Sequence, residues 1–142
     1  MSLSRESDFA ALVVLVVEDE FFIRRDIAER LRQSGYVVIE TGSGEEAIAL
    51  CRSAIPIDIL FTDINLLGPA TGWEVAQRFH AGRPGGSVLY TSGNPVDRAK
   101  CAHGTFIPKP YRHHDIASAF ARLRPKREHA PKTAQGSNQT PR

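Results

Sequence analysis

The sequence predicts an α/β fold in which a doubly wound, five-stranded parallel sheet lies between two layers of helices, a (βα)5 three-layer sandwich. Short apolar runs of strand length alternate along the chain with longer segments of helical periodicity. Within each run the apolar residues are nearly continuous, so helices must cover both faces of the sheet. The connections are short, which favours parallel strands joined by right-handed crossovers.

Five segments are expected to be strands. The first, Leu12–Val17, contains only leucine and valine, which suits a central strand buried on both faces. Ile59–Asp63 begins with an apolar run and ends on a carboxylate, and ligands of open α/β sheets bind outside the carboxyl ends of the strands. The remaining expected strands are Tyr36–Glu40, Ser87–Thr91 and Thr105–Ile107.

Helical signals lie between these strands. Ile23, Ile27 and Leu31 recur every four residues with charged residues between them, which indicates an amphipathic helix. Ser43 followed three residues later by Glu46 is a capping-box pattern that opens a second helix, expected to end near residue 52. The other expected helices are one over 72–81, a short one over 94–102, and a last one marked by Ile116, Phe120 and Leu123.

Length and composition favour one soluble domain. The chain has 142 residues, of which 42% are hydrophobic and 24% charged, and we expect the domain over residues 11–124 after a polar extension at 1–10. No apolar run approaches the roughly 20 residues of a membrane helix, and the polar start is not a signal peptide. Cys51 and Cys101 fall in predicted helices without metal-ligand spacing, so reduced thiols and a cytoplasmic location are expected.

The net charge of +2 is unevenly distributed. From Arg124 onward there are five basic residues and one acidic residue, which leaves 13 basic and 15 acidic residues before it. The sequence pI of about 8.7 therefore reflects a basic tail, which we expect to be disordered over 125–142. Direct nucleic-acid binding by the globular surface is not expected.

Polar side chains follow the predicted strands at the edge where their carboxyl ends meet. The first strand is followed by Glu18 and Asp19, the third ends in Asp63, the fourth ends in Thr91, and the fifth is followed by Lys109. Three close carboxylates repel one another unless a cation lies among them, and an all-oxygen site suits Mg²⁺ or Mn²⁺. A lysine and a hydroxyl beside that cation suit a phosphoryl group. A solvated ion-pair cluster is the alternative interpretation.

Four motifs give the chain a family resemblance. They are Val14–Glu20 (Val-Leu-Val-Val-Glu-Asp-Glu), Ile59–Asp63 (Ile-Leu-Phe-Thr-Asp), Val88–Gly93 (Val-Leu-Tyr-Thr-Ser-Gly) and Phe106–Pro110 (Phe-Ile-Pro-Lys-Pro). Over about Leu12 to Leu123 the chain resembles the receiver domain of bacterial two-component response regulators. The resemblance implies the flavodoxin-like fold of the chemotaxis response regulator.

The resemblance also implies a role for each residue at the strand ends. Asp63 would accept a phosphoryl group from a phosphohistidine, either on a sensor histidine kinase or on a histidine phosphotransfer protein. Asp19 and Asp63 would ligate Mg²⁺ directly, Glu18 would act nearby or through water, and the backbone carbonyl of Asn65 would complete the protein ligands.

The activating residues follow from the same resemblance. Lys109 would pair with Asp63 and then with the phosphate, and Thr91 would hydrogen-bond the phosphate and move toward it. Phe106 would be the aromatic switch residue that swings inward as Thr91 moves. The protein would be a phosphoacceptor that phosphorylates and dephosphorylates itself with Mg²⁺, and no substrate turnover is expected.

Two segments depart from the family pattern. Receiver domains usually carry a proline four residues after the acceptor and a glycine eight residues after it, whereas here these residues are Leu67 at the fourth place and Gly72 at the ninth. The loop after the acceptor is therefore one residue longer than in the family. The span from Thr91 to Lys109, 18 residues, is also short, so we expect a short or poorly ordered fourth helix and assume no family dimer face.

Three functional interpretations remain open. The leading one is a stand-alone receiver that signals by protein–protein contact with an unknown downstream target, or that passes the phosphoryl group along a phosphorelay. The second is a receiver fragment of a larger hybrid kinase or regulator. The third is a phosphohydrolase similar to the haloacid dehalogenases, which is weak because that family has an aspartate two residues after its nucleophile, where this chain has Asn65.

Overall fold

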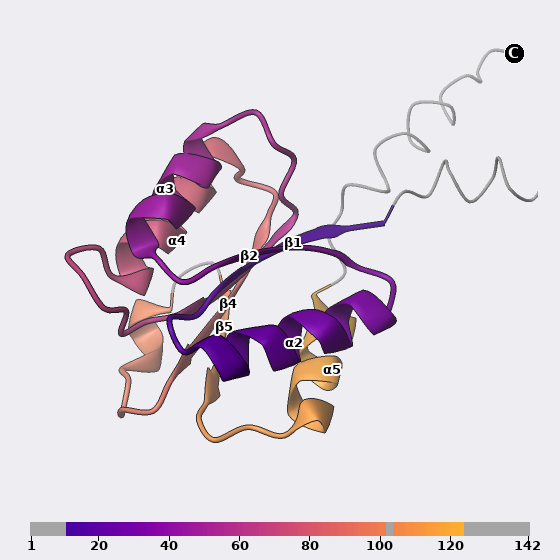
Figure 1. The fold of residues 1–142 in the computed structure, drawn as a ribbon. Helices are drawn as coiled ribbons and strands as arrows, with labels where there is room; N and C mark the ends of the chain where they lie inside the picture. Colours follow the sequence, from indigo (N-terminus) through magenta and orange to yellow (C-terminus); the bar gives the residue numbers. More distant parts are fainter. Residues whose placement is uncertain (1–10, 102–103, 124–142) are drawn as a thin grey trace, which may run out of the picture.

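The computed structural model describes residues 11–101 and 104–123, and within them five strands form one parallel sheet (Figure 1). The strands are β1 (Val13–Val17), β2 (Val37–Thr41), β3 (Ile59–Asp63), β4 (Ser87–Ser92) and β5 (Gly104–Pro108). Their order in the sheet is β2-β1-β3-β4-β5, and every neighbouring pair is parallel. The predicted doubly wound sheet is confirmed, and each strand boundary lies within one residue of the expected one.

Four α-helices of the described residues cover the two faces of the sheet. They are α2 (Phe21–Gln33), α3 (Gly44–Arg52), α4 (Gly72–Gly82) and α5 (His113–Arg122). Figure 1 shows α2 and α5 together on one side of the sheet and α3 and α4 together on the other. None of the described helices combines the length and the apolar character needed to cross a membrane.

The alternation of side chains along the strands divides the core into two layers. On β1, Val14 and Val16 pack with the apolar residues of α2 and α5, whereas Leu15 and Val17 pack with those of α3 and α4. All four side chains are buried, and full burial of each contributes about 1.5–3 kcal/mol. Because both faces of β1 are covered in this way, its sequence has no polar position.

The fourth helix, which we expected to be short or poorly ordered within 94–102, is not an α-helix in the described part of that segment. Only a three-residue 3-10 turn forms there, η1 (Arg98–Lys100), and Cys101 follows it instead of lying in a helix. Val96 and Cys101 are the apolar residues that this segment contributes to the core. Two apolar contacts five residues apart do not make the continuous face that stabilises a surface helix.

Helix capping also differs in part from the prediction. Ser43 caps α3 by accepting a hydrogen bond from the Glu46 backbone N–H, but the Glu46 carboxylate accepts from the Thr41 hydroxyl instead of returning to the cap. A capping box with both hydrogen bonds forms at α4, between Thr71 and Glu74. The predicted N-terminal extension at 1–10 and the predicted tail at 125–142 lie outside the described residues.

Candidate functional site

The strand order places a crevice at the carboxyl ends of β1 and β3. The chain runs from β1 to β2 at one edge and then crosses to β3 on the other side of β1, so β1 and β3 form the topological switch point of the sheet. Ligands of open α/β sheets bind at that point. Glu18 and Asp19 directly follow β1, and Asp63 is the last residue of β3.

The three predicted carboxylates come together in this crevice. One oxygen from each of Glu18, Asp19 and Asp63 lies within 4.8 Å of the others. Glu18 and Asp63 are only 4% and 6% exposed, so water screens their mutual repulsion poorly. A cluster of buried carboxylate oxygens is the donor set that a hard divalent cation such as Mg²⁺ prefers, so the residues present fit the ion that the resemblance implies.

Lys109 supplies a positive charge next to two of the three carboxylates. Its Nζ donates to Oε1 of Glu18 at 2.8 Å and to Oδ2 of Asp63 at 3.0 Å. The backbone N–H of Lys109 donates to the carbonyl of Ser92 at 2.9 Å, which fixes the residue at the end of β5. The structure therefore contains the pair of Lys109 with Asp63 that the resemblance implies, and Glu18 is a second partner of Lys109.

Burial and pairing shift the pKa values of Glu18 and Lys109. Burial raises the pKa of the Glu18 carboxyl above its ordinary value, although hydrogen bonds from Lys109 and from the Glu20 backbone act in the opposite direction. Burial alone lowers the pKa of Lys109, but the hydrogen bonds to Glu18 and Asp63 outweigh burial and hold that pKa above its ordinary value. Lys109 is therefore a permanent cation at neutral pH.

Thr91 lies beside the proposed acceptor with a hydroxyl that no described residue engages. It is the β-sheet partner of Asp63 in the β3–β4 register and is 2% exposed. Its Oγ1 has no hydrogen-bond partner among the described residues. A buried hydroxyl without a partner costs about 1–3 kcal/mol, so this group is available for a further acceptor at the site.

Asn65 is held at the rim of the crevice by its own side chain. Its backbone N–H donates to Oδ1 of Asp63 at 3.3 Å. Its side-chain oxygen accepts from the Ser92 hydroxyl at 2.9 Å and from the Asn94 amide at 3.3 Å. These two bonds connect the loop after β3 to the segment after β4, and the sequence did not indicate them.

The proposed switch residue Phe106 lies outside the acid cluster. It is half-buried on β5 in register with Tyr90, and it packs against the core layer beneath α3 and α4. The Arg98 guanidinium lies 5.3 Å from its ring centroid. Trp73 packs on Tyr90 with ring centroids 5.2 Å apart.

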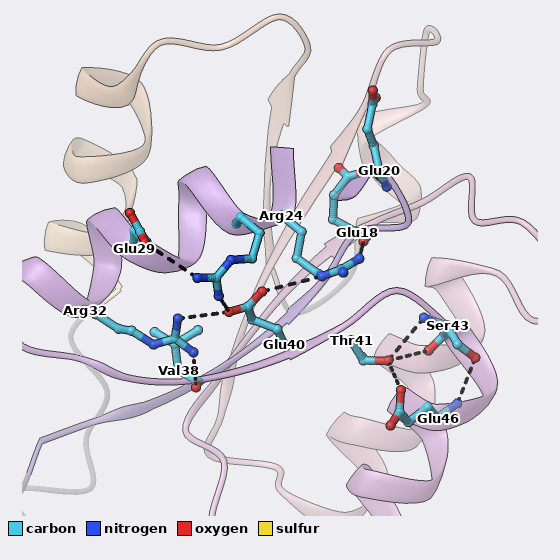
Figure 2. A network of polar contacts seen from close by, with 11 residues as sticks. Glu18, Glu20, Arg24, Glu29, Arg32, Val38, Glu40, Thr41, Ser43 and Glu46 are labelled. Atoms are coloured by element: carbon cyan, nitrogen blue, oxygen red, sulfur yellow. Dashed lines mark hydrogen bonds and ion pairs between the residues drawn. The ribbon is translucent and has the colours of Figure 1, made fainter. Parts of the chain in front are cut away.

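A charged network of residues from α2 and β2 reaches the backbone of Glu18 (Figure 2). Nη1 of Arg24 donates to the backbone carbonyl of Glu18 at 2.9 Å, and its Nε lies 3.5 Å from Glu40. Glu40 also accepts from Arg25 at 2.7 Å and from Arg32 at 2.9 Å. The sequence indicated only that these arginines lie on the polar face of an amphipathic helix. No local signal identified Glu40 as their common partner.

The backbone of the loop after Asp63 closes tightly on the acceptor strand. The N–H of Gly72 donates to the carbonyl of Ile64 at 2.9 Å. A Cβ added at Gly72 would lie 2.1 Å from the carbonyl oxygen of Asp63, so only glycine fits. Gly72 therefore places α4 against the site although it is one residue later than in the family pattern.

Comparisons with known proteins agree with this geometry. The family model of the response regulator receiver domain matches residues 14–121. The transcriptional regulatory protein PdtaR of Mycobacterium tuberculosis is 32% identical over 112 residues, which cover 75% of this chain and 54% of that protein. The chain thus spans about half the length of the curated relatives that it matches first.

Solved structures show the same fold. A response regulator receiver protein from Sinorhizobium medicae has a TM-score of 0.74 at 26% identity, over 81% of this chain and 95% of that chain. The receiver domain of the hybrid histidine kinase CckA has a TM-score of 0.67 at 29% identity, over 78% of this chain and 97% of that chain. The chain belongs to the response regulator receiver domain family.

Proposed function

We propose that Asp63 accepts a phosphoryl group from the phosphohistidine of a sensor histidine kinase or of a histidine phosphotransfer protein. The chain then signals in the cytoplasm by contact with a downstream protein. One observation carries this proposal: Lys109 Nζ bridges Glu18 and Asp63, and Asp19 lies in the same cluster of carboxylates. A solvated ion-pair cluster would have no need to bury Glu18 and Asp63 almost completely.

The side chains of the site divide the transfer between them. A carboxylate oxygen of Asp63 forms the new bond to phosphorus while the bond from phosphorus to the donor imidazole breaks, and the imidazole nitrogen keeps that electron pair. Lys109 neutralises negative charge on the transferred oxygens, and the Thr91 hydroxyl donates to one of them. The hydrogen bond from the Asn65 backbone keeps the Asp63 carboxylate oriented before the transfer.

A divalent cation completes the proposed site. Asp19 and Asp63 would hold Mg²⁺ or Mn²⁺ directly, with Glu18 nearby or acting through water and the Asn65 backbone carbonyl as a further ligand. When bound, the ion supplies positive charge that stabilises the transferred group.

The proposed response to phosphorylation involves Thr91 and Phe106. Once Thr91 donates to a phosphate on Asp63, its side chain moves toward that residue and leaves space on the β4 side of β5. Phe106 then turns inward from its half-buried position and changes the surface near η1, which a downstream protein recognises. Its present contact with the Arg98 guanidinium, 5.3 Å from the ring centroid, would be lost in that movement.

The proposal is tested by incubating the protein with acetyl phosphate and Mg²⁺ and measuring the intact mass. We expect the mass to increase by one phosphoryl group per chain. We expect no increase when EDTA is added before the donor, and none in Asp63→Asn. A wild-type mass that does not increase, or an equal increase in Asp63→Asn, would contradict the proposal. Repeated turnover of a phosphomonoester would favour a phosphohydrolase instead.

A further inference from the structure

The loop between β3 and α4 contributes a backbone group to the acid cluster. The N–H of Leu67 donates a hydrogen bond of 2.7 Å to Oδ2 of Asp19, a residue 48 positions earlier in the chain. We infer that this N–H is a positioning group, which holds the Asp19 carboxylate in the orientation that binds the divalent cation. The inference rests on the proposed function and adds to it a determinant of metal affinity particular to this chain.

The charges of the cluster explain why Asp19 needs such a partner. Lys109 forms ion pairs with Glu18 and Asp63, whereas Asp19 forms none with the described residues. Asp19 is therefore the carboxylate whose charge is left for an added cation. A carboxylate has two oxygens with about four acceptor sites, so Asp19 can accept the Leu67 N–H and still coordinate a metal ion.

The loop that carries this N–H is anchored by residues that follow Leu67. Gly68, directly after it, has φ of +93°, a left-handed conformation that turns the chain. Further along, Ala70 is buried and fills the space beside Gly44, where a Cβ would lie 2.9 Å from it. Gly72 then closes on the backbone of Asp63. The position of the donor is thus set by the turn at Gly68 and by packing at Ala70 and Gly72, of which Gly72 lies against the site.

Leu67 acts here through its backbone and not through its side chain. The residue is 78% exposed, so shortening its side chain removes little buried surface. The residue that receiver domains usually carry at this position, proline, has no N–H and cannot donate the bond. Backbone and side-chain contributions can therefore be separated by substitution at this one residue.

The affinity of the metal-free protein for Mg²⁺ tests the inference directly. The single tryptophan, Trp73, lies at the end of the loop as the second residue of α4, so its fluorescence can follow an Mg²⁺ titration. Hydrogen bonds to metal ligands typically change metal affinity by about 10–100-fold when they are lost. Two variants remove the donor, namely Leu67→Pro and an amide-to-ester replacement of the peptide bond between residues 66 and 67, and Leu67→Ala keeps it.

We expect the ester and Leu67→Pro to weaken Mg²⁺ binding by about 10-fold or more, and Leu67→Ala to bind within about twofold of wild type. The ester keeps the side chain and the loop conformation, so it decides the matter if Leu67→Pro does not fold. Unchanged unfolding temperatures in EDTA show that an affinity loss is not a loss of structure.

The outcomes separate this inference from the proposed function. If the ester and Leu67→Ala bind Mg²⁺ as tightly as wild type, and wild type accepts a phosphoryl group on Asp63, the inference alone is wrong. If wild type shows no saturable Mg²⁺ binding, the proposed metal site is wrong and the inference is wrong with it.

Discussion

Gly72→Ala places a new atom directly against the backbone of the proposed acceptor, Asp63. An added Cβ would lie 2.1 Å from the carbonyl oxygen of Asp63 and 2.7 Å from Cα of Ile64, both below the 3.0 Å that Cβ contacts essentially never breach. Because both neighbours are backbone atoms, no side chain can rotate away. The end of β3 and the start of α4 must separate by roughly 1 Å, a strain of the kind that overpacked cores show.

This separation has a cost that can be estimated. Overpacking destabilises proteins by about 1–3 kcal/mol. For a domain of about this size, 1 kcal/mol shifts the unfolding temperature by roughly 4 °C, so Gly72→Ala should unfold about 4–12 °C below wild type. A second effect is expected on function, because the backbone that moves carries the Asp63 carboxylate away from Lys109, at present 3.0 Å from it.

Gly85→Ala is the matched control, because a Cβ at Gly85 meets no atom within 4 Å. Circular dichroism gives the unfolding temperature of each variant, and intact mass after acetyl phosphate treatment gives the rate of phosphorylation. We expect Gly85→Ala to match wild type in both and Gly72→Ala to be slower in phosphorylation at a temperature where it is fully folded. Equal unfolding temperatures and equal rates in the two variants would refute the reasoning.

Three further predictions concern the side chains of the cluster. Thr91→Val removes a buried hydroxyl without a described partner and should leave stability unchanged or raise it, whereas Thr62→Val loses the 2.9 Å bond to the Asp63 carbonyl and should cost about 1–2 kcal/mol; equal losses in thermal unfolding would contradict this. Lys109→Met leaves the two buried carboxylates of Glu18 and Asp63 in repulsion. Its unfolding temperature should therefore lie below that of wild type by a margin that narrows as pH falls from about 7 to about 4. A margin independent of pH would contradict the role of Lys109 in neutralising these carboxylates. Burial raises the pKa of Glu18 above 4.5, so its contribution to stability is complete below that pH and is lost as pH rises through the folded-state pKa. Glu18→Gln should therefore gain stability relative to wild type in urea unfolding as pH rises from about 4 to about 7. A relative loss of stability would show that folding lowers the pKa of Glu18 instead of raising it.

The sheet and the carboxylate cluster followed from the sequence for a simple physical reason. Strands buried on both faces, such as Leu12–Val17, leave no polar position until the strand ends, so Glu18 and Asp19 are marked by their place after the run. The parallel topology then brings that strand end beside Asp63. Hence the sequence was sufficient to predict which side chains meet at the site.

The loops and the caps could not be predicted in the same way, because they depend on backbone contacts between distant segments. The bond from Leu67 to Asp19 involves a backbone N–H, which every residue except proline carries, so its side chain gives no signal. The choice of Glu46 between the Ser43 cap and the Thr41 hydroxyl is likewise decided by the position of β2. Local patterns identified Ser43 and Glu46 but not the partner that Glu46 takes.

The identity of the phosphorylated residue is tested most directly by trapping it chemically. Borohydride reduces an aspartyl phosphate to homoserine, and peptide mass spectrometry then locates the converted residue. After treatment with acetyl phosphate and Mg²⁺, we expect homoserine at position 63 and none at position 19, and we expect no 2-amino-5-hydroxypentanoic acid, the product that a phosphorylated glutamate would give, at position 18. Homoserine at any other aspartate with Asp63 unchanged, or no conversion in a protein that has gained the mass of a phosphoryl group, would contradict the assignment of Asp63 as the acceptor.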